Sequence, residues 1–151
     1  MEDNEYKTAL RLALQALNRR FLSEKELRDK LAQKEVKETE VEAVVAYLKK
    51  LRYLDDQRLA GQVAAYYAKS KRYGEQYVRQ KLRLRGLPPE TGAADPEAEA
   101  DNAVYLLKKK YGKSYDPKDR QKMYRYLQYR GFAPDAIYTA MGKVCDELTE
   151  S

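Results

Sequence analysis

One phrase occurs three times in this sequence, and the repetition limits the folds that the chain can adopt. The copies are KLAQKEVKETEV at 30–41, KLRLRGLPPET at 81–91 and YLQYRGFAPDAI at 126–137. When they are aligned, Leu31, Leu82 and Leu127 coincide, with shifts of 51 residues (82 − 31) and 45 residues (127 − 82). Such a period is typical of helical repeat proteins, whose repeats must stack because each one alone has too small a core.

Each copy of the phrase contains the expected end of a helix. Gly86 and Gly131 follow an arginine and precede an apolar residue, which predicts a left-handed glycine between the second and third helices of a repeat. In the first copy Glu35 takes this place, at a cost of roughly 1 kcal/mol if its backbone is left-handed. The apolar residues expected to fill the three corners are Val36, Leu87 and Phe132.

The first repeat carries signals for three helices. Ser23 and Glu26 match a capping box at the start of a second helix, in which each side chain bonds the backbone N–H of the other residue. Apolar residues at helical spacing predict the buried faces of the first and third helices. On the first helix they are Leu10, Leu14 and Leu17 with Ala9, Ala13 and Ala16, and on the third Val41, Val44, Val45 and Leu48.

The later repeats carry cap signals too, but the middle repeat is incomplete. Asp55 is expected to cap the helix that opens this repeat, and Asp95 and Asp116, each followed by proline, to cap two helices of the last repeat. The positions equivalent to Val41 and Val45 in the middle repeat are Gly92 and Pro96. We therefore expect a loop over 88–95 in place of a third helix.

These patterns predict an all-α fold: a curved, elongated array of tandem three-helix repeats whose middle repeat lacks its third helix. The predicted boundaries are 1–54 for the first repeat, 55–94 for the degenerate second repeat and 95–151 for the third. We expect the chain to be a monomer.

Several functional classes are disfavoured by what the sequence lacks. It has no histidine, one cysteine (Cys145), no P-loop and no paired-cysteine motif, so neither an enzyme nor a metal or cofactor site is expected. Cys145 is expected to be a buried structural thiol. No apolar run approaches the roughly 20 residues that span a bilayer, and the N-terminal segment is acidic, which predicts a soluble cytoplasmic protein without membrane contact.

Positive charge is concentrated in two segments. Residues 69–85 hold seven basic residues against one acidic residue, and residues 102–130 hold nine against two. The tyrosines in or beside them are Tyr66, Tyr67, Tyr73, Tyr77, Tyr124, Tyr126 and Tyr129. A basic surface with interleaved rings suits nucleic acid, whereas the alternative is a solvated helix face with tyrosines in the core.

The candidate residues for binding nucleic acid or a filament on it are taken from these two segments. They are Lys69, Lys71, Arg72, Arg79, Lys81, Arg83, Arg85, Lys108, Lys109, Lys110, Lys122, Arg125 and Arg130. No catalytic residue is assigned.

Four stretches together resemble the RecX regulators of the RecA recombinase. They are NRRFLSEKELRDKLAQKEV at 18–36, VVAYLKKLRYLDDQRLA at 44–60, GEQYVRQKLRLRG at 74–86 and YLQYRGFAPDAI at 126–137. The chain departs from the family pattern at Glu35 and Arg52, where glycine is usual, and at Leu59, where phenylalanine is usual.

The resemblance implies a protein that lies in the groove of the RecA filament on single-stranded DNA. It implies inhibition of RecA ATPase, strand exchange and co-protease activity, and thereby control of recombinational DNA repair and the SOS response. It also implies DNA binding, to single strands, with double strands left open. Two alternatives remain from the residues alone: a general nucleic-acid-binding helical protein or helix-turn-helix regulator, and a helical adaptor that binds only protein.

Overall fold

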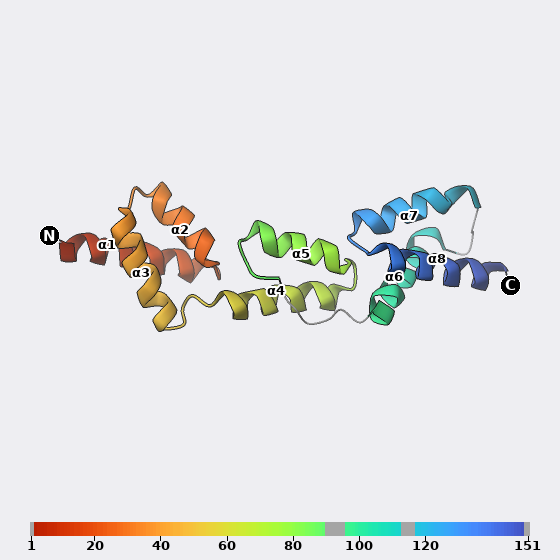
Figure 1. The fold of residues 1–151 in the computed structure, drawn as a ribbon, viewed down its shortest axis with the longest axis horizontal. Helices are drawn as coiled ribbons and strands as arrows, with labels where there is room; N and C mark the ends of the chain where they lie inside the picture. Colours follow the sequence, from red (N-terminus) through yellow and green to blue (C-terminus); the bar gives the residue numbers. More distant parts are fainter. Residues whose placement is uncertain (1, 90–95, 113–116, 150–151) are drawn as a thin grey trace. The chain divides into compact units, whose positions relative to one another are not determined.

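A computed structural model describes residues 2–89, 96–112 and 117–149, and all regular structure in these ranges is helical. The α-helices are α1 (Glu2–Arg19), α2 (Glu24–Gln33), α3 (Glu38–Lys50), α4 (Asp56–Ser70), α5 (Glu75–Leu84), α6 (Pro96–Tyr111), α7 (Arg120–Tyr129) and α8 (Pro134–Thr149). A short 3-10 helix, η1 (Pro117–Asp119), precedes α7 (Figure 1). The predicted all-α class and the tandem three-helix arrangement are confirmed.

The chain forms two compact units, which we describe separately. The first unit comprises Met1–Val63 and Leu82–Glu90, and the second comprises Ala64–Lys81 and Thr91–Ser151. Helices α4 and α5 each supply residues to both units, since they contain the points at which the chain passes from one to the other.

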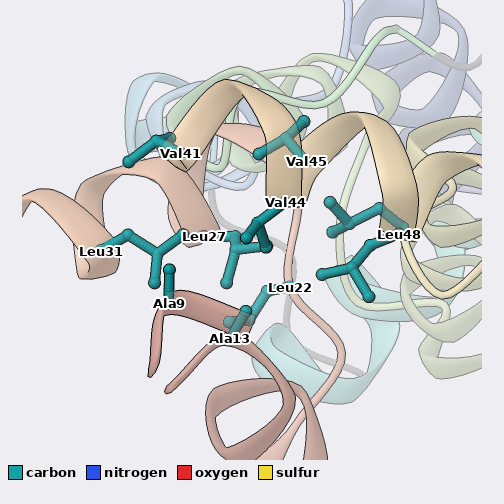
Figure 2. Packing of buried hydrophobic residues seen from close by; sticks show 10 residues of the cluster. Ala9, Ala13, Leu22, Leu27, Leu31, Val41, Val44, Val45 and Leu48 are labelled. Carbon is teal, nitrogen blue, oxygen red and sulfur yellow. The ribbon is translucent and has the colours of Figure 1, made fainter. Parts of the chain in front are cut away.

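The core of the first unit lies between α1, α2 and α3. Figure 2 shows side chains from these three helices and from Leu22 pointing toward one another. Ala9, Ala13, Leu27, Leu31, Val41, Val44, Val45 and Leu48 are all buried there. One prediction is wrong: Leu14 is 42% exposed, because α1 turns its small alanine face into the core and leaves this leucine outside.

The core of the second unit is formed by α6, α7 and α8. Its fully buried side chains include Leu107, Leu127, Phe132 and Ile137. Met141 and Val144 of α8 are buried as their helical spacing predicts. Cys145, one residue further on, is only partly buried, so the expectation of a buried thiol is not met.

The repeated phrase adopts the same helix-ending turn three times. The backbone N–H groups of Val36, Leu87 and Phe132 donate to the carbonyls of Leu31, Leu82 and Leu127 at 3.1, 2.8 and 3.1 Å. The residue before each of them has positive φ: 62° at Glu35, 72° at Gly86 and 87° at Gly131. This is the Schellman arrangement, in which a left-handed residue lets the chain reverse and satisfies carbonyls at the helix end. The alignment of the three copies is confirmed at these positions.

The helix caps can be checked for two of the four predicted residues. The Ser23–Glu26 capping box is present, and the backbone N–H of Arg58 donates to the Asp55 carboxylate at 3.1 Å. Asp95 and Asp116 lie outside the described residues, as does most of the loop predicted over 88–95. The described residues between Leu84 and that gap contain no helix.

Candidate nucleic-acid interface

Arg85 and Arg130 occupy equivalent corners of successive repeats, and each corner packs on the start of an earlier helix. In the first unit, the Ser23 hydroxyl at the start of α2 donates to the Arg85 carbonyl. In the second unit, the backbone N–H of Gly74, just before α5, donates to the Arg130 carbonyl at 2.8 Å. Ser23 and Gly74 are themselves equivalent, since 23 + 51 = 74. Equivalent positions therefore meet at both junctions, with a side-chain hydroxyl as donor in the first and a backbone N–H as donor in the second.

The two arginine side chains have different surroundings. The Arg85 guanidinium binds the Glu26 carboxylate at 2.9 Å and the Phe21 carbonyl at 2.9 Å. The Arg130 guanidinium lies 5.3 Å from the ring centroids of both Tyr73 and Tyr126. Of its N–H groups, one makes a long hydrogen bond, 3.4 Å, to the Arg72 carbonyl.

This difference separates a structural arginine from one that can bind a ligand. A guanidinium has five N–H donors, and carboxylate pairing occupies the edge of the group that would bind a phosphate. A guanidinium that contacts aromatic rings instead can keep N–H donors for a ligand. Arg85 was among the predicted site residues; because its side chain is bound within the fold, we leave it out of the interface proposed below.

Arg130 belongs to a continuous series of rings and cations, which we call the cation–tyrosine ladder. Tyr73 and Tyr77 stack with centroids 4.1 Å apart and planes 13° apart. Lys81 lies 5.2 Å from the Tyr77 centroid, and Lys110 lies 4.0 Å from the Tyr126 centroid. The order along the ladder is Lys81, Tyr77, Tyr73, Arg130, Tyr126 and Lys110. It joins residues of α5, α6 and α7 with the turn before α5.

Tyr67 and Tyr66 of α4 extend the aromatic surface. The Tyr67 ring meets Tyr73 and Tyr77 edge-on, each at 5.6 Å, and Tyr66 meets Tyr67 at 5.2 Å. Tyr66 is 72% exposed, so its ring is available to a ligand. Elsewhere in the second unit, Tyr124 packs against Tyr138, which the sequence analysis did not single out, and Tyr129 is 86% exposed.

The remaining candidate residues are mostly exposed cations. Those classed as exposed are Lys69, Lys71, Arg72, Arg79, Arg83, Lys108, Lys109, Lys110, Lys122 and Arg125, whereas Lys81 is partly buried. Arg79 pairs with Glu75 one turn earlier at 2.7 Å. Except for Arg83 and Arg85, all the candidate residues belong to the second unit. The contacts bring Lys81, Lys110 and Arg130 into one series through the tyrosine rings, and the Arg72 carbonyl joins it by its long bond from Arg130.

Sequence reasoning missed Gly74, which makes the second junction possible. A Cβ atom built on Gly74 would lie 2.4 Å from the Gly131 carbonyl oxygen, and one on Gly131 would lie 2.3 Å from the Tyr77 backbone nitrogen. Both distances are shorter than real Cβ atoms make, so both glycines are required by close backbone approach. The repeat alignment gives no signal for Gly74, because its equivalent in the first repeat is Ser23, which carries a side chain.

Electrostatic pairing in the first unit is internal to the fold. Although burial acts to raise it, hydrogen bonds from Arg85 and from the Ser23 N–H hold the pKa of Glu26 below its ordinary value. Lys49 and then Arg28 lower the pKa of Glu24, against the effect of burial. These two carboxylates stabilise the start of α2, and cations of the same unit already occupy them.

Within the described part of the chain, no three metal-ligating side chains gather into a group that could hold an ion. None of the described helices is long and apolar enough to cross a membrane.

Comparison with known proteins decides the family. Models of the first, second and third three-helix domains of RecX match residues 9–48, 55–94 and 97–141. The chain belongs to the RecX family. The regulatory protein RecX of Vibrio cholerae is 38% identical over 140 residues, which is 89% of this chain and 91% of that protein. The regulatory protein RecX of Clostridioides difficile is 29% identical over 95% of this chain and 71% of its own length.

Solved RecX structures share the fold. RecX from Lactobacillus salivarius matches with a TM-score of 0.83 at 18% identity, covering 94% of this chain and 97% of that one. A second regulatory protein RecX matches with a TM-score of 0.76 at 20% identity, covering 99% and 75%. RecX is a family of regulatory proteins rather than of enzymes, which agrees with the absence of assigned catalytic residues.

Proposed function

We propose that this RecX protein regulates the RecA recombinase by binding in the groove of its filament on single-stranded DNA. In this role it inhibits RecA ATPase, strand exchange and co-protease activity, and so modulates recombinational repair and the SOS response in the cytoplasm. It acts as a monomer by binding alone and catalyses no reaction. The boundaries of the three repeats, 1–54, 55–94 and 95–151, remain part of the proposal.

The cation–tyrosine ladder is the observation that supports this proposal best. Phosphates bind cations with release of counterions, and exposed rings accept stacked bases without regard to sequence. A filament regulator needs such sequence-independent contact, because RecA assembles along any strand it coats. The ladder offers three cations on three rings within the second unit, and Tyr66 adds an exposed ring beside them.

A wedge mechanism follows from this assignment. The basic surface of the second and third repeats contacts filament-bound DNA, while the acidic segment 88–101 and the first repeat contact RecA protein. A protein held between adjacent RecA subunits in this way hinders subunit exchange and closure of the ATP-binding interface. A general nucleic-acid-binding protein would bind DNA equally well and leave RecA ATPase unchanged.

The decisive experiment titrates the protein into RecA turning over ATP on single-stranded DNA. We expect progressive inhibition by the wild type and its loss in the triple variant Arg79→Ala, Lys81→Ala, Arg83→Ala. The same variant should bind single-stranded DNA more weakly. The slope of log K against log salt should fall by roughly 0.7 for each phosphate that the variant no longer neutralises.

A matched control removes three exposed lysines of the first repeat, Lys30, Lys34 and Lys50, by the same change to alanine. It should keep DNA binding, which would show that the loss in the triple variant does not come from removing positive charge as such. Absence of inhibition by the wild-type protein would refute the proposed function. Loss of DNA binding with inhibition intact would refute the wedge, because contact with RecA protein alone would then be sufficient.

A further inference from the structure

Beside its buried alanine face, helix α1 carries three leucines: Leu10 and Leu17 pack partly against the core, and Leu14 is exposed. Its alanine face is buried, with Ala9 and Ala13 at most 1% exposed, whereas Leu14 is 42% exposed. Leu10 and Leu17, one turn away on either side, are only partly buried. Tyr53, just after α3, is 58% exposed. These four side chains form the floor of a surface groove of about 710 Å³, which we call the α1 groove.

The rim of the α1 groove is positively charged. Lys7 and Arg11 line it one turn apart, and both are exposed. Its other polar lining residues include Gln15 and Asn18, which are uncharged, and no carboxylate from the described side chains lines the groove. Three leucines and a tyrosine beneath two cations would match a ligand that is apolar on one side and acidic on the other.

The spacing of the leucines indicates the shape of that ligand. Leu10, Leu14 and Leu17 span seven residues of helix, which is roughly 10 Å or two turns at 1.5 Å per residue. A second helix that lays an apolar stripe along them would make the i, i+4, i+7 contacts typical of helix-in-groove recognition. Nucleic acid fits less well, because Tyr53 is the one ring among the described lining residues and leucines make up the rest of the floor.

We propose that the α1 groove binds an acidic amphipathic helix of a protein partner. Apolar side chains of that helix fill the groove over Leu14, and its carboxylates pair with Lys7 and Arg11. The surface lies in the first compact unit, whereas the cation–tyrosine ladder lies in the second. The inference therefore stands on its own observations and does not require the DNA-binding role.

The test uses synthetic peptides of about three helical turns on the full-length protein. The first peptide places leucines at i, i+4 and i+7 with glutamates on the opposite face; the second has lysines for the glutamates; the third is a scramble of the first. We expect the acidic amphipathic peptide to bind at least about tenfold more tightly than the other two, measured by fluorescence anisotropy. Amide NMR shifts should change along α1.

Two variants place the binding in the groove. Leu14→Ser should weaken the acidic peptide roughly tenfold, as expected for removing one leucine from a buried interface, while Leu84→Ser, which alters a leucine that is 64% exposed on α5, should not. Lys7→Glu with Arg11→Glu should reverse the preference toward the lysine peptide. Equal binding of the scramble, an unchanged affinity in Leu14→Ser, or shifts confined to residues outside α1 would each overturn the proposal. So would a matching loss of oligothymidine binding in Leu14→Ser, since the groove would then serve nucleic acid.

Discussion

At the scale of single residues, three described residues other than glycine have the left-handed backbone conformation that favours glycine. Glu35, Arg52 and Lys71 have φ of 62°, 64° and 57°. A glutamate is tolerated at position 35 because its side chain is exposed. The later corners leave no such space: a Cβ on Gly131 would meet backbone atoms of Tyr77, and one on Gly86 would meet the side chain of Lys25.

We expect Glu35→Gly and Arg52→Gly each to stabilise the protein by roughly 0.5–1 kcal/mol. A left-handed residue with a Cβ costs about 1–2 kcal/mol, from which the greater entropy lost by glycine on folding subtracts about 0.5–1 kcal/mol. The free energy of unfolding in urea measures the effect. Lys34→Gly is the control, since Lys34 has φ of −88° and should lose stability. A destabilised Glu35→Gly would mean that the glutamate side chain contributes more than its backbone strain removes.

At the scale of elements, the sequence predicts what local chemistry determines. The capping box at Ser23 and the glycine corners depend on residues within one or two turns, so their patterns are readable in the sequence. Which face of α1 is buried cannot be read from the sequence, because its leucines and its alanines both recur at helical spacing. Only packing against α2 and α3 places the alanines in the core.

For the candidate site, the sequence likewise predicts local features but not contacts between distant residues. Charge and tyrosine content indicate the segments concerned, but the roles of Arg85 and Arg130 depend on partners far away in sequence. Arg85 meets Glu26, 59 residues earlier, and Arg130 bonds Arg72, 58 residues earlier. No local pattern distinguishes a corner arginine bound to a carboxylate from one held between rings.

The Arg85–Glu26 junction predicts a pH dependence of stability. The pKa of Glu26 is lower in the folded protein than its ordinary value of 4.5, so folding favours the ionised carboxylate. Its contribution is therefore complete above about pH 4.5 and decreases as the pH falls through the folded-state value. Glu26→Gln should lower the free energy of unfolding at pH 7 and flatten its decline between neutral and acidic pH. Asp29→Asn, which removes an exposed carboxylate from the same helix, is the control for the change from acid to amide. An equally steep decline in Glu26→Gln would show that the junction does not depend on this carboxylate.

At the scale of the whole molecule, one repeated scaffold carries two different surfaces. The first unit pairs its charges internally, through Glu24, Glu26, Arg28, Glu42 and Lys49. The second holds most of the candidate cations, three of them on tyrosine rings. The two repeats can differ in surface because both junctions accept at a main-chain carbonyl, of Arg85 or Arg130, and leave the arginine side chain free to take different partners.

This division predicts opposite outcomes for the same change at the two equivalent arginines. Arg85→Ala removes the partner of a partly buried carboxylate and should destabilise the first unit by about 1–3 kcal/mol, because Glu26 then loses charged hydrogen bonds. DNA binding should be retained where the variant is folded. Arg130→Ala should weaken single-stranded DNA binding and RecA inhibition together, at a smaller cost in stability, since it leaves no carboxylate without its partner. Arg130→Lys keeps the charge but loses the planar group that contacts Tyr73 and Tyr126, and should restore DNA binding only in part.

The three variants are compared by urea unfolding, by DNA binding and by RecA ATPase. If Arg85→Ala is as stable as the wild type and Arg130→Ala binds DNA normally, the two corners do not differ in function.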